Sequence, residues 1–137
     1  MNPFEFFIPQ NIIVGAGTLV RLPECAQKLG GTHAMLLSGP TLRKMGIVDK
    51  AAKYLEDAGM KVDIFTEIEA NPSVTTVEKA TTAFKEAGAD FIVALGGGSP
   101  MDVAKAVGVT AKYGGSITEY EGAHKVPGKI IPLIAIP

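Results

Sequence analysis

The sequence predicts an α/β fold built on a doubly wound, mainly parallel sheet. Short apolar runs that suit strands buried on both faces alternate with longer segments whose apolar residues recur at helical spacing. Glycine, proline and serine turns separate these segments, and strands and helices that alternate in this way form parallel sheets with right-handed crossovers. The 137 residues suffice for one domain with its own core.

Composition excludes several classes of protein. Apolar residues make up 47 % of the chain and charged residues 20 %, so disorder is not expected. Lysine and arginine number 13 against 14 acidic residues and tryptophan is absent, which gives no sign of a nucleic-acid surface. The single cysteine, Cys25, lies in a predicted apolar helix stripe and indicates a buried structural thiol in a reducing compartment. We find no secretory signal and no apolar run long enough to cross a membrane, and we expect a cytoplasmic protein.

The first elements are predicted from turn residues and spacing. Two short strands over 4–7 and 11–14 should form a β-hairpin near the sheet edge. A helix follows as far as residue 29, with an apolar stripe made of Leu19, Leu22, Ala26 and Leu29. The Gly15-Ala16-Gly17 that opens it imitates a dinucleotide fingerprint, but the third glycine is missing and a hairpin precedes it. We therefore interpret it as a tight turn.

The remaining elements alternate between strand and helix. Ser38-Gly39-Pro40 ends the first central strand, and Gly59 is expected to cap the helix that follows it. Ser73 should cap the next helix, which carries Val74, Val77, Thr81 and Phe84 at helical spacing and stops at Gly88. Residues 116–129 form a loop-rich segment. The predicted strands cover 34–37, 62–65, 91–95 and 130–136, and the predicted helices cover 48–58, 74–87 and 100–111.

The segment 90–107 carries the strongest functional signal. A buried apolar strand runs directly into Gly96-Gly97-Gly98 and then into a helix that Ser99-Pro100 opens. We expect Ser99 as the N-cap, Pro100 as the first helical residue and Asp102 as a capping carboxylate in the first turn.

Such a turn presents unpaired N–H groups and the positive end of a helix dipole to a ligand above the sheet edge. A phosphate or pyrophosphate fits there. One glycine would satisfy any tight turn, whereas three in a row favour close approach of a ligand.

Two other phosphate or hydrolytic chemistries fit poorly. The glycines are not followed by G-K-[ST], which argues against nucleotide hydrolysis by a P-loop. Ser99 stands in G-G-S-P rather than G-x-S-x-G, and Pro100 has no N–H to offer an oxyanion hole.

Four segments together resemble the iron-containing (group III) alcohol dehydrogenases, nearest the branch of lactaldehyde reductase and 1,3-propanediol dehydrogenase. They are F-x-x-P-x-x-I-x-x-G-x-G over 6–17, N-P-S over 71–73, G-G-G-S-P-M-D-V-A-K-A over 96–106 and I-P-L-I-A-I-P over 131–137. The likeness spans the whole chain. The triple glycine is shared with relatives of glycerol dehydrogenase and dehydroquinate synthase, but the four segments together are specific to the alcohol dehydrogenases.

The resemblance implies that residues 1–137 form a Rossmann-like, dehydroquinate synthase-like N-terminal domain that binds NAD or NADP. It also implies roles for individual residues. Gly97, Gly98 and Ser99 would hold the cofactor pyrophosphate through backbone N–H groups. Asp102 would approach the nicotinamide side, and Asn71 would lie near the cofactor; a capping carboxylate and an ordinary turn asparagine are their structural alternatives.

Gly39 departs from the family pattern. Many NAD-preferring members carry an aspartate at this place, where a carboxylate accepts hydrogen bonds from the ribose and repels a 2′-phosphate. Gly39 removes that repulsion, so we expect NADP to be accepted, with Thr41 and either Arg43 or Lys44 close to the phosphate.

The resemblance implies hydride transfer between the nicotinamide and a primary alcohol or aldehyde, assisted by Fe²⁺ or another divalent metal. In the family a C-terminal helical domain, which this chain lacks, supplies the metal ligands. We predict no catalytic or metal-binding residue here, since His33 and His124 are far apart and have no ligand spacing. We expect the chain alone to lack dehydrogenase activity, to bind cofactor weakly and to self-associate, plausibly as a homodimer through the hairpin edge. A stand-alone nucleotide-binding module without catalysis remains the alternative.

Overall fold

Four parallel strands form the centre of the structure, a computed structural model that describes residues 17–120 and 126–137. They are β1 (His33–Ser38), β2 (Lys61–Phe65), β3 (Phe91–Leu95) and β4 (Leu133–Ile136), in the spatial order β2-β1-β3-β4. The parallel sheet confirms the predicted α/β fold. The predicted hairpin over 4–14 and the turn at Gly15-Ala16 lie outside the described residues.

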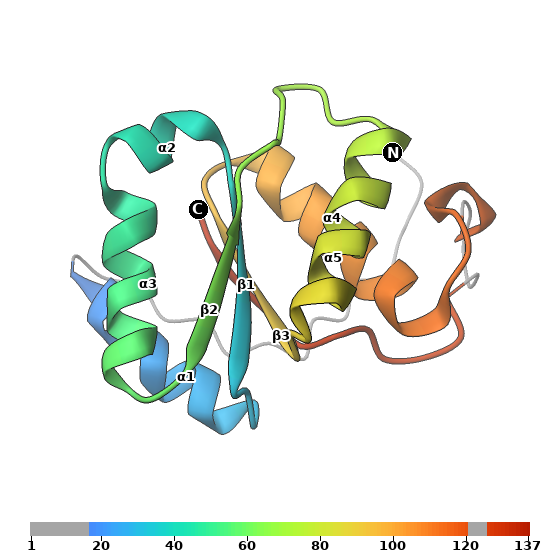
Figure 1. Ribbon diagram of the computed structural model, residues 1–137. Helices are drawn as coiled ribbons and strands as arrows, with labels where there is room; N and C mark the ends of the chain where they lie inside the picture. Colours follow the sequence, from blue (N-terminus) through green and yellow to red (C-terminus); the bar gives the residue numbers. More distant parts are fainter. Residues whose placement is uncertain (1–16, 121–125) are drawn as a thin grey trace, which may run out of the picture.

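Helices cover both faces of this sheet (Figure 1). On one side lie α1 (Leu22–Lys28) and α3 (Ile47–Asp57), and on the other α4 (Val74–Ala87) and α5 (Gly98–Tyr113). Alternate residues of the two central strands enter two separate cores. Leu36 and Val93 pack in the first core with residues of α1 and α3, while Leu37 and Ile92 pack in the second with residues of α4 and α5. Both faces of these strands are therefore apolar, which explains their unbroken apolar sequences.

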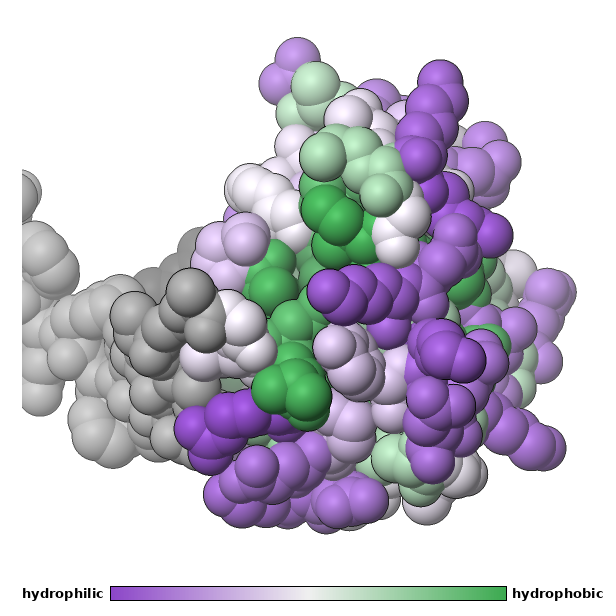
Figure 2. All heavy atoms as spheres, turned by 90° about the vertical axis from the view of Figure 1, so that its left-hand side faces the viewer, coloured by the Kyte–Doolittle hydropathy of each residue, from purple (hydrophilic) through white to green (hydrophobic). Residues whose placement is uncertain are grey.

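Three short helical segments complete the fold: the 3₁₀ helices η1 (Thr18–Arg21) and η2 (Ile117–Tyr120) and the helix α2 (Pro40–Lys44). The sequence analysis predicts no helix at α2, because Ser38-Gly39-Pro40 has the composition of a turn. Pro40 is instead the first helical residue, and its fixed φ suits that position. Figure 2 views the side formed by α1, α2 and α3, where hydrophilic side chains surround a band of hydrophobic ones.

The first predicted helix is shorter than expected. Its α-helical part ends at Lys28, so Leu29 is the C-cap and is 44 % exposed rather than part of the buried stripe. Leu22 and Ala26 are buried as predicted, and Leu19 packs against their core. Cys25 is only half-buried, so the expectation of a buried thiol was wrong.

The two helices beside the central strands largely follow the prediction. Ser73 caps α4 in a capping box with Thr76, and Gly88 ends the helix in the left-handed conformation with φ 75°. Val74 is 40 % exposed, since it is the first helical residue and the buried face is formed by later ones. Ala58, not Gly59, is the C-cap of α3; Gly59 follows it with φ 88°.

The last predicted strand is also shorter. Regular pairing covers only Leu133–Ile136, and these residues are half-buried or exposed rather than fully buried. Among the described residues β4 stands at the edge of the sheet and pairs with β3 alone, so one side of it lacks a covering strand. No helix in the described ranges has the length and apolar character required to cross a membrane.

Candidate nucleotide-binding site

The carboxyl ends of all four strands meet at one edge of the sheet. From β1 the chain passes outward to β2 on one side, and β3 leads to β4 on the other, so the strand order reverses between β1 and β3. Ligands of open α/β sheets bind in the crevice at such a point. The Ser38 hydroxyl donates to the Leu95 carbonyl over 2.9 Å and joins the ends of the two strands. Figure 1 shows this edge at the top, beside α2 and the first turn of α5.

The three glycines after β3 have different structural needs. Gly96 has φ 115°, and a Cβ there would lie 3.2 Å from Leu42 Cδ1 and 3.4 Å from Pro100 Cγ. The fold itself therefore requires glycine at this position. Gly97 has φ −75°, and at Gly97 and Gly98 an added Cβ would meet no heavy atom within 4 Å among residues 17–120 and 126–137. Contacts with the described residues therefore do not require glycine at these two positions, and no described heavy atom occupies the space into which a Cβ would point.

The helix α5 begins two residues earlier than predicted. Gly97 is its N-cap and Gly98 its first residue, so the expectation of Ser99 as N-cap was wrong. Pro100 is consequently the third helical residue, and Asp102 is the fifth, outside the first turn. Within the described part of the chain no side chain caps α5. Its first N–H groups and the positive end of its dipole therefore lie at the carboxyl edge of the sheet without a competing acceptor among the described side chains.

Ser99 makes a different contact. Its hydroxyl donates to the Ala70 carbonyl over 2.7 Å, in the loop 66–73 that joins β2 to α4. The partner is 29 residues away in sequence, which explains why the local capping pattern was misleading.

Side-chain contacts anchor the loop 66–73 near both of its ends. Ile68 is buried, and the Thr76 hydroxyl donates to Glu69 Oε1 over 2.6 Å. This hydrogen bond from Thr76 is the largest cause that holds the pKa of the Glu69 carboxyl below its ordinary value. Asn71 is exposed on the crest between these anchors and Ser73. Sequence reasoning did not single out Glu69 and Thr76, because the capping box here has threonine where glutamate or glutamine is usual.

The structure brings the other predicted residues to the same sheet edge. Gly39 is the N-cap of α2 with φ −84°, and a Cβ there would lie 3.9 Å from the Ile68 carbonyl oxygen. Thr41 is exposed in the first turn of α2. Asp102 is exposed and lines a small hollow of about 180 Å³ between α4 and α5. All seven predicted cofactor-binding residues thus follow the carboxyl ends of β1, β2 and β3.

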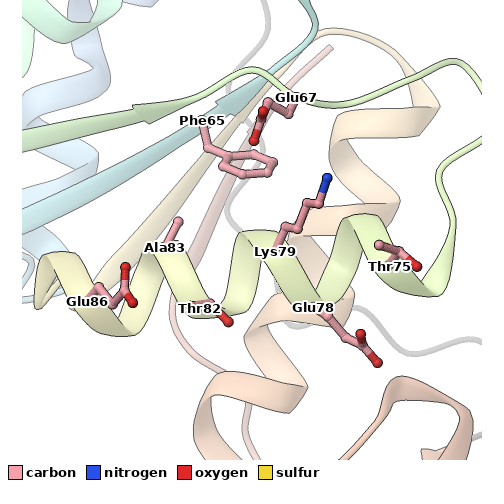
Figure 3. Close-up of a pocket in the computed structure, with 8 residues that line it drawn as sticks. All are labelled: Phe65, Glu67, Thr75, Glu78, Lys79, Thr82, Ala83 and Glu86. Carbon is pink, nitrogen blue, oxygen red and sulfur yellow. The ribbon is translucent and has the colours of Figure 1, made fainter.

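A larger groove, of about 450 Å³, lies elsewhere, between β2 and α4 (Figure 3). Its lining includes three carboxylates, from Glu67, Glu78 and Glu86, and one cation, Lys79. Figure 3 shows Thr75, Glu78, Thr82 and Glu86 spread along α4, whereas Lys79 extends towards Phe65 and Glu67 on the β2 side. A site with this acidic lining repels phosphate, so we place the candidate site at the glycine turn, although Gly97 and Gly98 line neither hollow.

The described residues do not fit a catalytic metal centre. No group of three or more histidine, cysteine, aspartate or glutamate side chains that could hold a metal occurs in residues 17–120 and 126–137. His124 lies outside these ranges.

Comparison with known proteins identifies the family. The model of the family described as iron-containing alcohol dehydrogenase matches residues 9–137. The chain belongs to this family. The NAD-dependent methanol dehydrogenase of Bacillus methanolicus is 33 % identical over 132 residues, which are 96 % of this chain and 35 % of that protein. This confirms the family predicted from the four sequence segments.

Solved structures of this alcohol dehydrogenase family have the same fold. A 1,3-propanediol oxidoreductase superposes with a TM-score of 0.92 at 35 % identity, over 98 % of this chain and 35 % of that one. The sulfoacetaldehyde reductase of Bifidobacterium kashiwanohense, solved in complex with NAD⁺, gives a TM-score of 0.87 at 28 % identity, over 100 % of this chain and 36 % of that one. The chain therefore spans about a third of the length of these relatives.

Proposed function

We propose that this chain is the cofactor-binding part of an NAD(P)-dependent dehydrogenase that transfers hydride between the nicotinamide and a primary alcohol or aldehyde. The observation that carries the proposal is the open space above Gly97 and Gly98 at the point where the strand order reverses. Two glycines that the contacts of the described residues do not require stand where a pyrophosphate would approach the start of a 16-residue helix, which no described side chain caps. The names of the relatives, which are NAD-dependent or NAD⁺-bound alcohol and aldehyde enzymes, support the same function.

In this proposal the chain binds and orients the cofactor. The N–H groups of Gly97, Gly98 and Ser99 donate to the pyrophosphate, and the helix dipole adds a favourable field. Asp102, in α5, approaches the nicotinamide side of the cofactor, and Asn71, in the loop 66–73, lies near the cofactor. A metal that polarises the substrate oxygen would need ligands other than the residues that the structure describes.

We further propose that the site accepts NADP as well as NAD. Gly39 places no carboxylate where the ribose 2′-position is expected, so a 2′-phosphate meets no repulsion there. Thr41, Arg43 and Lys44 belong to the helix α2 that begins directly after Gly39 and offer one hydroxyl and two cations.

The alternative is a nucleotide-binding module without catalysis, which would use the same glycine turn. The match of the family model to residues 9–137 favours the dehydrogenase. The proposed cytoplasmic location and self-association rest on composition and on the hairpin over 4–14. Neither proposal enters the argument for cofactor binding.

The test is a titration of the purified chain with NADH and with NADPH, followed by the fluorescence of the reduced nicotinamide. We expect saturable binding that Gly98→Val weakens about tenfold or more, a loss of about 1.4 kcal/mol, because the side chain enters the space of the pyrophosphate. Thr75→Val, at an exposed position in the first turn of the neighbouring α4, is the matched control and should bind as the parent does.

Thermal unfolding of each variant shows whether the fold is intact. Failure of the parent to saturate with either nucleotide, or unchanged binding by Gly98→Val, contradicts the proposed site. We also expect no reduction of NAD or NADP by an alcohol on this chain, since a metal site is missing from the described residues. Saturable binding together with alcohol-dependent reduction of the cofactor would support the proposed cofactor site. It would contradict the proposal that catalysis needs residues beyond those described.

A further inference from the structure

The hydroxyl of Ser99 is already engaged in the protein. It donates to the Ala70 carbonyl over 2.7 Å, and Ser99 is half-buried. A serine hydroxyl has one hydrogen to donate. While this bond is present, the side chain of Ser99 cannot also donate to a phosphate, although its backbone N–H remains free to do so.

The hydrogen bond from Ser99 holds the part of the loop 66–73 that no other described side-chain contact fixes. Ile68 and Glu69 fix the beginning of the loop through burial and the bond to Thr76, and Ser73 fixes its end as the cap of α4. The crest between them, residues 70–72, is exposed or half-buried. Among the described side chains, Ser99 is the one outside the loop that hydrogen-bonds to this crest.

We propose that Ser99 is a positioning residue that ties the crest, and with it Asn71, to the glycine turn. Asn71 directly follows the carbonyl that Ser99 holds, so a fixed Ala70 carbonyl restricts where the amide side chain points. The proposal rests on the proposed function, because Asn71 then faces the cofactor whose pyrophosphate the turn binds. Binding at the turn and order in the loop are thereby coupled through one hydroxyl.

This role differs in its consequences from a direct phosphate contact. When the hydroxyl is removed, the crest gains freedom, and the cofactor loses affinity because Asn71 is no longer in place. Removal of the amide of Asn71 takes away the same contribution. The two changes should therefore not add, as is usual for residues that act through one contact.

The experiment is a double-mutant cycle of Ser99→Ala and Asn71→Ala on the whole chain, with NADH affinity and amide hydrogen exchange as readouts. We expect each single variant to weaken NADH binding about three- to tenfold, the range for one hydrogen bond. The affinity of the double variant for NADH should equal that of the single variant that binds NADH less tightly. Without NADH, the amides of Asn71 and Ser73 should exchange faster in Ser99→Ala than in the parent. Ser99→Thr, which keeps a hydroxyl, should restore both readouts. Thr82→Ala, at an exposed position of α4 in the groove away from the glycine turn, should change neither.

Two results overturn the inference. Additive losses in the cycle with unchanged exchange at Asn71 would mean that the hydroxyl contacts the phosphate directly. Unchanged exchange together with unchanged affinity in Ser99→Ala would mean that the bond has no role. If the parent itself does not bind NADH, the proposed function fails. The exchange comparison then separately decides whether Ser99 orders the crest.

Discussion

The two ends of the parallel sheet treat their polar groups in opposite ways. At the amino end the Asp90 carboxylate accepts hydrogen bonds from the N–H of Thr32 at 3.0 and 3.2 Å, from the N–H of His33 at 3.0 Å and from the Thr32 hydroxyl at 2.5 Å. At the carboxyl end the start of α5 carries no side-chain cap from the described residues. Polar groups that the protein satisfies itself stabilise the fold, and groups that it leaves open are available to a ligand.

The glycines at the two ends repeat this contrast. A Cβ at Gly31, at the amino end, would lie 2.5 Å from Cδ1 and 2.7 Å from Cε1 of the fully buried Phe91. A Cβ at Gly97 or Gly98 would meet open space within the described part of the chain. The same residue type therefore serves internal packing at one end and access for a ligand at the other. The available space around each glycine distinguishes the two roles, which the sequence cannot do.

The largest effect on stability is expected from a substitution that disrupts packing at the amino end of the sheet. Gly31→Ala should lower the free energy of unfolding by about 1–3 kcal/mol, because the new methyl group overlaps the ring of Phe91 in a filled core. Gly98→Ala, the same change at the other end, should not lower it, because the methyl group meets no described atom and alanine is the better helix former. Urea denaturation of both variants measures the difference.

A second substitution tests the cause of this loss. Phe91→Leu in the Gly31→Ala background should cost less than it costs in the parent, since the smaller side chain relieves the overlap. Equal losses for the two alanine variants would remove the distinction between a packing glycine and a ligand glycine.

A smaller effect concerns Asp90. Partial burial raises the pKa of this carboxyl, but the hydrogen bonds from Thr32 and His33 together lower it more, so the pKa lies below its ordinary value. A carboxyl whose pKa is lower in the folded than in the unfolded state contributes stability above the unfolded value of about 3.9. That contribution is lost as the pH falls below about 4 through the folded pKa.

Asp90→Asn should therefore lower the free energy of unfolding at neutral pH by about 0.5–1 kcal/mol, since water screens this exposed carboxylate, and should make the decline of stability in acid shallower. Denaturation series at several pH values between neutrality and about pH 3 measure both quantities. Glu78→Gln, at an exposed position of α4, is the control and should leave the free energy of unfolding at neutral pH unchanged. An equally steep acid decline in Asp90→Asn would show that the carboxylate network does not hold the amino end.

The sequence was sufficient for the features that depend on local pattern. The unbroken run Phe91–Leu95 and the helical spacing after it identified a buried strand and a helix, and both exist. The four motifs identified the family, and the predicted cofactor residues gather at one sheet edge because parallel strands all end there.

Features that depend on distant partners could not be predicted. Serine is a favoured N-cap residue, yet the Ser99 hydroxyl donates a hydrogen bond to the carbonyl of Ala70, 29 residues earlier, and the helix starts at Gly98. The importance of Asp90 depends on Thr32, 58 residues away in the sequence. Only the assembled sheet brings these residues together. The local sequence pattern therefore predicted the glycine turn after β3 but not the hydrogen bonds that Ser99 and Asp90 make.

The smallest expected effect sharpens the description of the carboxyl end. Gly39 adopts an extended conformation with φ −84°, and an added Cβ would make an ordinary contact of 3.9 Å with the Ile68 carbonyl oxygen, so Gly39→Asp should fold as the parent does. Its carboxylate should accept hydrogen bonds from the ribose of NADH and repel the 2′-phosphate of NADPH. We expect the ratio of NADPH to NADH affinity to fall about five- to tenfold, or about 1 kcal/mol. Parallel fluorescence titrations with NADH and NADPH measure this ratio.

Gly39→Asn has nearly the same shape without the charge and separates charge repulsion from steric exclusion. Added salt should reduce the effect of aspartate but not of asparagine. Unchanged NADPH affinity in Gly39→Asp would mean that the ribose phosphate does not lie beside residue 39, and the proposed acceptance of NADP would lose its basis.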